Sequence, residues 1–187
     1  LVLVSAPRPA EAKVFEIWGS AIAGGVFGNG NASSDRDFFN WASGGGAGFE
    51  VGARFLFFGA WIDYVRFFGG DAGANLFTFN LGGDTTIGLS GGLKLVLRLA
   101  GTFYYGTIDD ATHEGMSSDQ VDTRGIGFRG GIGLRYEFAK VFSFGVTPEG
   151  AYHYFFGGAE DNALETENNS HGWNFRVMGY FRVGLGF

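Results

Sequence analysis

The chain has no cysteine, only three prolines and no long hydrophobic run. Without cysteine, neither a disulfide nor a thiolate metal site can hold the fold. Glycine is abundant, at 35 of 187 residues, but the scarcity of proline and the lack of a three-residue period exclude a collagen-like chain. No stretch approaches the roughly 18 apolar residues that a membrane-spanning helix needs.

Basic residues are also scarce, with 13 Lys and Arg against 19 Asp and Glu and a formal net charge of −6. This balance argues against nucleic acid as a partner. The mean hydropathy of +0.08 is too low for a helical membrane protein. It suits a transmembrane β-barrel, in which only alternate residues face lipid. The length corresponds to one domain.

The last fifteen residues alternate between two kinds of side chain. Every second position is apolar or glycine: Trp173, Phe175, Val177, Gly179, Phe181, Val183, Leu185 and Phe187. The residues between them are mostly polar, small or charged. A period of two predicts a β-strand with different environments on its two sides, and the strand is about three times the usual length of roughly 5 residues.

Seven earlier segments repeat this pattern. The expected strands span residues 14–27, 42–56, about 60–68, 76–89, 93–105, 126–138 and 142–156. Polar loops at 28–40, 69–75, 106–124 and 157–171 alternate with tight turns. In the third strand Asp63 and Arg66 fall on opposite faces, which predicts a β-bulge.

Eight alternating strands with this loop pattern predict an all-β fold, an eight-stranded antiparallel up-and-down transmembrane β-barrel. The apolar face must point outward, because the interior of an eight-stranded barrel is barely wide enough for side chains. A soluble lipocalin-like barrel would place that bulky face inside, and we reject it on volume. Closure also pairs every backbone group, as lipid requires. We expect an interfacial aromatic girdle of Trp41, Trp173, Tyr104, Tyr105, Tyr152 and Tyr154.

The chain resembles small bacterial outer-membrane barrels, in particular the OmpA transmembrane domain and the OmpX/Ail group. The resemblance rests on the long alternating strands, the loop pattern and the terminal Phe187. It implies an outer-membrane location with periplasmic termini and extracellular long loops. It also implies that Val183, Leu185 and Phe187 form the signal that the barrel-assembly machinery reads.

Residues 1–12 read as the remnant of a secretory signal peptide, and residues 13–187 as the barrel domain. The apolar start and the small-x-small motif of Ala10-Glu11-Ala12 carry this interpretation. The alternative is a genuine N-terminal extension.

Several charged residues are expected to face the barrel interior, called the lumen below. Strand lengths place Glu50, Arg98, Arg129 and Glu149 at mid-barrel depth. Nearer the periplasmic end we expect Arg54, Lys94, Arg135, Glu137 and Arg182. Since unpaired buried charges are strongly penalised, we predict a salt-bridged plug. The alternative is a narrow channel for small polar solutes or ions.

A lipid-modifying enzyme is a second alternative, but we expect no enzymatic activity. His153 and Glu149 point the same way about 13 Å apart, too far for a direct pair. Ser170-His171 lies at rim height but matches no known motif. The acidic loops lack EF-hand spacing, so we expect no cofactor and no metal site. The expected role is structural, envelope-stabilising or surface-interacting. The expected partners are outer-membrane lipid, lipopolysaccharide, the assembly machinery and a surface or envelope protein.

Overall fold

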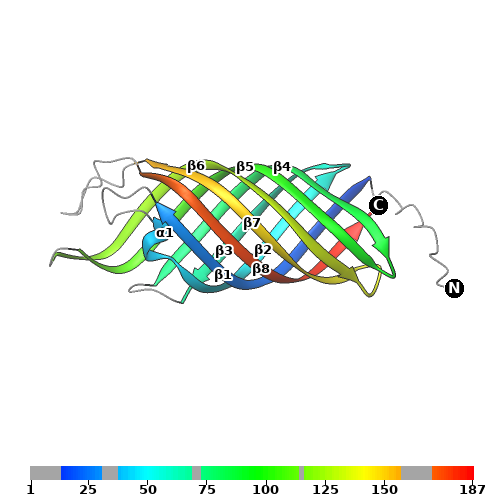
Figure 1. The fold of residues 1–187 in the computed structure, drawn as a ribbon, viewed down its shortest axis with the longest axis horizontal. Helices are drawn as coiled ribbons and strands as arrows, with labels where there is room; N and C mark the ends of the chain where they lie inside the picture. Colours follow the sequence, from blue (N-terminus) through cyan, green and yellow to red (C-terminus); the bar gives the residue numbers. More distant parts are fainter. Residues whose placement is uncertain (1–13, 31–37, 69–72, 114–115, 157–169) are drawn as a thin grey trace.

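A computed structural model describes residues 14–30, 38–68, 73–113, 116–156 and 170–187. All eight strands are antiparallel to their neighbours, and they close into a barrel in sequence order (Figure 1). The expected fold class is confirmed. The elements are β1 (Phe15–Gly30), α1 (Phe38–Trp41), β2 (Gly44–Phe55), β3 (Phe58–Phe67), β4 (Ala74–Ser90), β5 (Leu93–His113), β6 (Met116–Glu137), β7 (Phe142–Phe156) and β8 (Ser170–Gly186).

The barrel closes where β1 pairs with β8 over fifteen residue pairs. The last residue completes the seam, because the Phe187 carbonyl accepts hydrogen bonds from the amides of Val14 and Phe15 at 3.0 and 3.1 Å. Leu185 and Val183 point outward beside it, as does the Phe187 ring. The role of these three residues as an assembly signal stays a prediction.

The two faces of the sheet differ as the alternation predicts. Outward positions carry exposed large apolar side chains on every strand, such as Phe79, Phe128 and Phe181. Inward positions carry buried polar and charged groups, such as Asp84 and Arg135. No helix within the described ranges is long and apolar enough to cross a membrane.

The two ends of the barrel are unlike each other. The C-terminus and the short β2–β3, β4–β5 and β6–β7 connections lie at one end, called the turn end (Figure 1). Helix α1 and the β5–β6 hairpin lie at the opposite end, called the loop end. The four connections at the loop end correspond to the four predicted polar loops.

Two of those predicted loops are wrong in part. Residues 106–124 form no long loop, because β5 runs to His113, β6 begins at Met116 and the two stay paired. This part of the sequence carries few apolar residues, so its hydrophobic periodicity is lost while its backbone pairing persists. Within 28–40, β1 continues to Gly30 and α1 begins at Phe38. Most of the predicted loop 157–171, together with the proposed signal remnant, lies outside the described residues.

The bulge expected in β3 is also wrong. Strand β3 pairs with β2 and β4 in unbroken register. Asp63 faces the lumen and Arg66 faces outward near the loop end. The pattern misled because Trp61 and Val65 fill the lumen from this strand, so its inward face is also apolar.

Helix α1 turns back into the loop end of the lumen and fills it with aromatic rings. Phe38 and Phe39 are each 1% exposed and lie edge to face at 5.3 Å. They belong to a continuous buried group, called the apolar plug below. Its members are Ile22, Val26, Phe38, Phe39, Ala42, Val65, Phe67, Ala74, Leu76, Tyr104, Ile108, Phe155 and Met178.

Two strand glycines make room for this plug. A Cβ added at Gly106 would lie 2.8 Å from Cδ2 of Phe38. One added at Gly28 would overlap the Cβ of Phe39 and approach its carbonyl oxygen at 3.3 Å. Gly28 therefore leaves no room for a side chain beside α1, and a side chain at Gly106 would force the Phe38 ring to shift.

We expect Gly28→Ala to lower the free energy of unfolding by about 1 to 3 kcal/mol, since overpacking forces α1 to move. The matched control is Gly45→Ala, where an added Cβ meets nothing within 4 Å. Denaturant unfolding in detergent micelles measures both. Equal stability of the two variants would contradict the packing of α1 described above.

Candidate functional site

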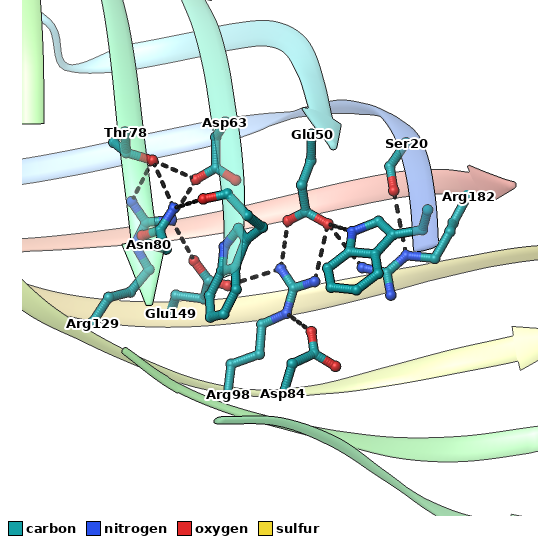
Figure 2. A network of polar contacts seen from close by, with 12 residues as sticks. Ser20, Glu50, Asp63, Thr78, Asn80, Asp84, Arg98, Arg129, Glu149 and Arg182 are labelled. Carbon is teal, nitrogen blue, oxygen red and sulfur yellow. Dashed lines mark hydrogen bonds and ion pairs between the residues drawn. The ribbon is translucent and has the colours of Figure 1, made fainter. Parts of the chain in front are cut away.

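Glu50 is the centre of the polar part of the lumen (Figure 2). Arg98 donates to both its carboxylate oxygens, at 2.6 and 3.0 Å. Arg182 and the Trp18 indole donate to Oε1 at 2.8 and 2.7 Å. These four side chains come from strands β1, β2, β5 and β8. One carboxylate therefore links strands that lie on different sides of the barrel.

From Arg98 the ion pairs continue toward the turn end. Its Nε donates to Asp84 at 2.8 Å. Asp84 also accepts from Arg54 at 3.2 Å, and Arg54 lies 2.6 Å from Glu16. All four charges are buried, so each one relies on its neighbours rather than on water.

A second group of ion pairs lies toward the loop end. Asp63 accepts hydrogen bonds from Thr78 at 2.8 Å, from Arg176 at 3.1 Å and from Arg129. Glu149 accepts from Nε of Arg176. Here two carboxylates share two guanidiniums, an arrangement in which formal charges balance.

Arg98 joins the two groups, because its Nη1 lies 3.7 Å from Glu149 (Figure 2). Tryptophan rings cover two of the guanidiniums. The Arg98 guanidinium lies 5.2 Å from the centroid of Trp61, and that of Arg182 lies 4.7 Å from Trp18. Such cation–π contacts favour the charged form in a desolvated setting.

Together these charges form one chain of contacts, called the lumen network below. Its buried members are five carboxylates and six guanidiniums: Glu16, Glu50, Asp63, Asp84, Glu149, Arg54, Arg98, Arg129, Arg135, Arg176 and Arg182. Near-equal numbers of opposite charges allow most members to be paired. Within the described residues, no group of three or more His, Cys, Asp or Glu could hold a metal ion.

All nine charged residues named from the sequence point into the lumen. Besides those above, Lys94 and Glu137 pair at 2.7 Å with side chains about a fifth exposed, 19% and 22%. Arg135 is 1% exposed, and its nearest recorded carboxylate contact is Glu16 at 4.0 Å. Lys94 and Glu137 therefore form a separate rim pair.

Four members were missed by sequence reasoning: Glu16, Asp63, Asp84 and Arg176. Each lies on the inward parity of its strand, next to positions that were identified. Glu16, Asp84 and Arg176 could have been found from the sequence, because each lies on the polar side of an alternating strand. Asp63 was obscured by the apolar inward residues of β3.

His153 is enclosed rather than available to a substrate. It has no exposed surface, and its Nδ1 lies 3.2 Å from the Asn174 amide nitrogen. The rings of Phe39 and Phe155 lie 4.8 Å from its own. His171 points outward, 6.3 Å from Tyr152.

The predicted aromatic girdle is wrong for one residue, Tyr104. Tyr104 faces inward and belongs to the apolar plug, while its neighbour Tyr105 faces outward. Trp173, Tyr152 and Tyr154 do lie on the outer face near the loop end. The Trp41 side chain lies outside the described residues.

No protein-family model matches the sequence, and no curated protein sequence matches it. The structure itself is similar to a crystal structure of Neisserial surface protein A, NspA, with a TM-score of 0.51. The match covers 90% of this chain and 96% of that chain. The fold is that of a small outer-membrane β-barrel. Sequence identity is only 15%, so the likeness concerns the fold alone.

Two further barrels of this class match with lower scores. The N-terminal barrel domain of Pseudomonas aeruginosa OprF has 17% identity and a TM-score of 0.49, covering 88% of this chain and 96% of that one. The attachment invasion locus protein Ail of Yersinia pestis has 12% identity and a TM-score of 0.42, covering 91% and 99%.

We expect Asp63→Asn to lower the free energy of unfolding by about 3 to 5 kcal/mol, because it leaves the buried Arg129 and Arg176 with only one shared carboxylate, that of Glu149. Lys94→Met removes a charge from the partly exposed rim pair and should change it by no more than about 1 kcal/mol. Equilibrium unfolding in vesicles or micelles compares the two. A similar loss in both would show that the lumen network is no more desolvated than the rim.

Proposed function

We propose that this chain is an integral outer-membrane barrel with a sealed lumen and a structural, envelope-stabilising or surface-interaction role. The observation that carries the proposal is the closure of the lumen at two successive levels. A barrel that does not conduct presents only its outer wall and its ends to other molecules.

The first level is the lumen network. Its side chains reach across the barrel from opposite strands, as the contacts of Glu50 with β1, β5 and β8 show. Moving any one of them aside would leave a buried charge unpaired, at a cost of several kcal/mol. Ions therefore meet a barrier that is held in place by its own electrostatics.

The second level is the apolar plug at the loop end. Phe39 lies 6.4 Å from Tyr104 and 5.9 Å from Phe155, so rings from β5, β7 and α1 meet in the lumen. A hydrated ion crossing this layer would lose its water without gaining a polar partner. An ion would have to pass both levels in turn. The lumen network opposes it through its paired charges, and the apolar plug opposes it through the cost of dehydration.

The proposed location is the bacterial outer membrane, with the turn end periplasmic and the loop end extracellular. The exposed apolar outer wall supports the membrane location, since a soluble monomer does not tolerate a patch of this size. In this orientation the segments 28–40, 106–124 and 157–171 face the outside. We propose them as the surface that contacts an envelope or surface protein, while lipid and lipopolysaccharide surround the wall. The barrel-assembly machinery remains the proposed partner during biogenesis.

The two alternative functions have less support from the geometry. A narrow channel needs a continuous polar path, and the apolar plug interrupts it. A lipid-modifying enzyme needs an accessible base, and His153 is enclosed by Asn174, Phe39 and Phe155.

Planar-bilayer recordings of the refolded protein test the seal. We expect silence from the parent, from Glu50→Ala with Arg98→Ala, and from Phe38→Ala with Phe39→Ala, because each double variant keeps one level intact. The quadruple variant should conduct. A steady conductance in the parent would overturn the seal and favour the channel.

A matched control combines the two phenylalanine changes with Lys94→Ala and Glu137→Ala, which removes one rim ion pair and leaves the lumen network complete. It should stay silent. Heat-modifiable electrophoretic mobility shows whether each variant is folded. Conductance in this control would mean that the lumen network is not a barrier.

A further inference from the structure

One buried guanidinium of the lumen network has no close carboxylate partner. Arg135 is 1% exposed, and its Nε has no hydrogen-bond partner among the described residues. Its nearest recorded carboxylate is that of Glu16, whose Oε1 lies 4.0 Å from Nη1 and which also lies 2.6 Å from Arg54. Glu137 follows on the same face of β6, but it pairs with Lys94 at 2.7 Å. In the part of the chain that the structure describes, every other guanidinium of the network has a carboxylate oxygen within hydrogen-bond distance.

The charges that face the lumen do not sum to zero over the described strands. The cations are the six guanidiniums of the lumen network and Lys94, and the anions are its five carboxylates and Glu137. Seven minus six leaves one positive charge. Arginine does not lose its proton in a protein, and an uncompensated buried charge is strongly penalised. The excess charge resides at Arg135, because the other cations are paired.

Two hydroxyl groups lie beside Arg135 on the lumen side. In register, Arg135 of β6 is opposite Gly145 of β7, and Gly145 is opposite Tyr180 of β8. The Tyr180 hydroxyl reaches over Gly145, 2.6 Å from where a Cβ of that residue would be. Thr147 is the next inward residue of β7, and its hydroxyl is buried without a hydrogen-bond partner among the described residues. The guanidinium and both hydroxyls can donate hydrogen bonds, so this part of the lumen suits a negatively charged acceptor.

The strand positions bring these donors together and leave them open to the turn end. A Cβ added at Gly133 would overlap the Thr147 hydroxyl, so that hydroxyl is directed toward β6. Gly133 precedes Arg135 by two residues on the same face of β6. Lys94 is opposite Arg135 in register, and its side chain is 19% exposed. A small solute that passes the rim pair therefore arrives beside Arg135.

We propose that Arg135, Thr147 and Tyr180 bind one small monovalent anion such as chloride. One negative charge balances the charges that face the lumen, whereas a dianion such as sulfate would leave an excess of negative charge in a desolvated place. A halide accepts hydrogen bonds from every direction, so one ion can serve a guanidinium and two hydroxyls together. The inference does not depend on the role proposed above, because it concerns only the charge balance inside the barrel.

Urea unfolding in micelles tests the site at constant ionic strength, with sodium chloride replaced stepwise by sodium gluconate, whose anion is too large for the lumen. A ligand that binds only the folded state stabilises that state by mass action. We expect the folding equilibrium constant of the parent to rise about tenfold for each tenfold rise in chloride above the Kd. The matched control Arg124→Met removes an exposed arginine near the loop end and should keep this dependence.

Arg135→Met should abolish the chloride dependence. In gluconate it should be at least as stable as the parent, because it removes a buried charge that has no close partner. If Glu16 alone were a sufficient partner for Arg135, the variant would lose the same stability in both salts, and the proposal would be wrong. Thr147→Val and Tyr180→Phe keep the charge and remove one donor each. Each should raise the Kd for chloride about fivefold, the change expected for one hydrogen bond.

Bromide locates the ion, because it resembles chloride in charge and size and scatters X-rays anomalously. Crystals of the parent grown in bromide should show an anomalous peak in contact with the Arg135 guanidinium, and crystals of Arg135→Met should show none there. Two results would overturn the site: a peak only elsewhere, or a parent whose stability does not distinguish chloride from gluconate. Either result would mean that water, rather than an anion, solvates Arg135.

Discussion

The pairing of β1 with β8 is the constraint on which the rest of the structure depends. In lipid, an unpaired strand edge would expose a row of backbone N–H and C=O groups with no water to bind them. Closure removes that edge, and the terminal residue Phe187 contributes to it directly. Closure at eight strands also sets the interior width, which leaves space that side chains must fill.

The chain fills that space in two different ways along its length. Toward the turn end and the middle, every filler comes from a strand, and long charged side chains reach across and pair. At the loop end the filling comes from α1, which lies between β1 and β2 in the chain and places Phe38 and Phe39 in the lumen. Several glycines provide the space that these fillers need. Gly28 and Gly106 leave room where α1 enters the lumen, and Gly52 leaves room where Trp18 and Trp61 meet. High glycine content is therefore a consequence of packing bulky groups inside a narrow barrel.

Buried ion pairs are not in themselves strong evidence of stability, since desolvation offsets much of their attraction. Their contribution here is to specificity, because these hydrogen bonds form only when the strands are in one register. Glu50 accepts four hydrogen bonds from three different strands, and shifting a strand by one residue would turn each donor to the lipid side. We infer that the lumen network specifies the register of the closed barrel, in addition to its proposed role in the seal.

Alternation with a period of two predicted the eight strands, the two faces and the inward position of Glu50, Arg98, Arg129 and Glu149. It could not predict features that lack this period. The β5–β6 hairpin continues where the sequence no longer alternates, and β3 alternates poorly because Trp61 and Val65 face inward. Phe38 and Phe39 were visible as two adjacent phenylalanines in a polar loop, but only the returning chain shows that they enter the lumen. Partner choice within the network, such as Asp63 with Arg129 and Arg176, depends on depths that strand tilt and shear determine.

The proposed seal leaves recognition to the outside of the barrel. Most of the outer wall is uniform, since Phe, Leu and Ile side chains do not select among lipid acyl chains. Charges that point toward a membrane are expensive unless headgroups or water reach them. Arg66, Asp122 and Arg124 face outward, and they lie near the loop end, where the outward residues of β3 change from Ile62 through Tyr64. The placement of these outward charges is therefore the one that the proposed membrane position requires.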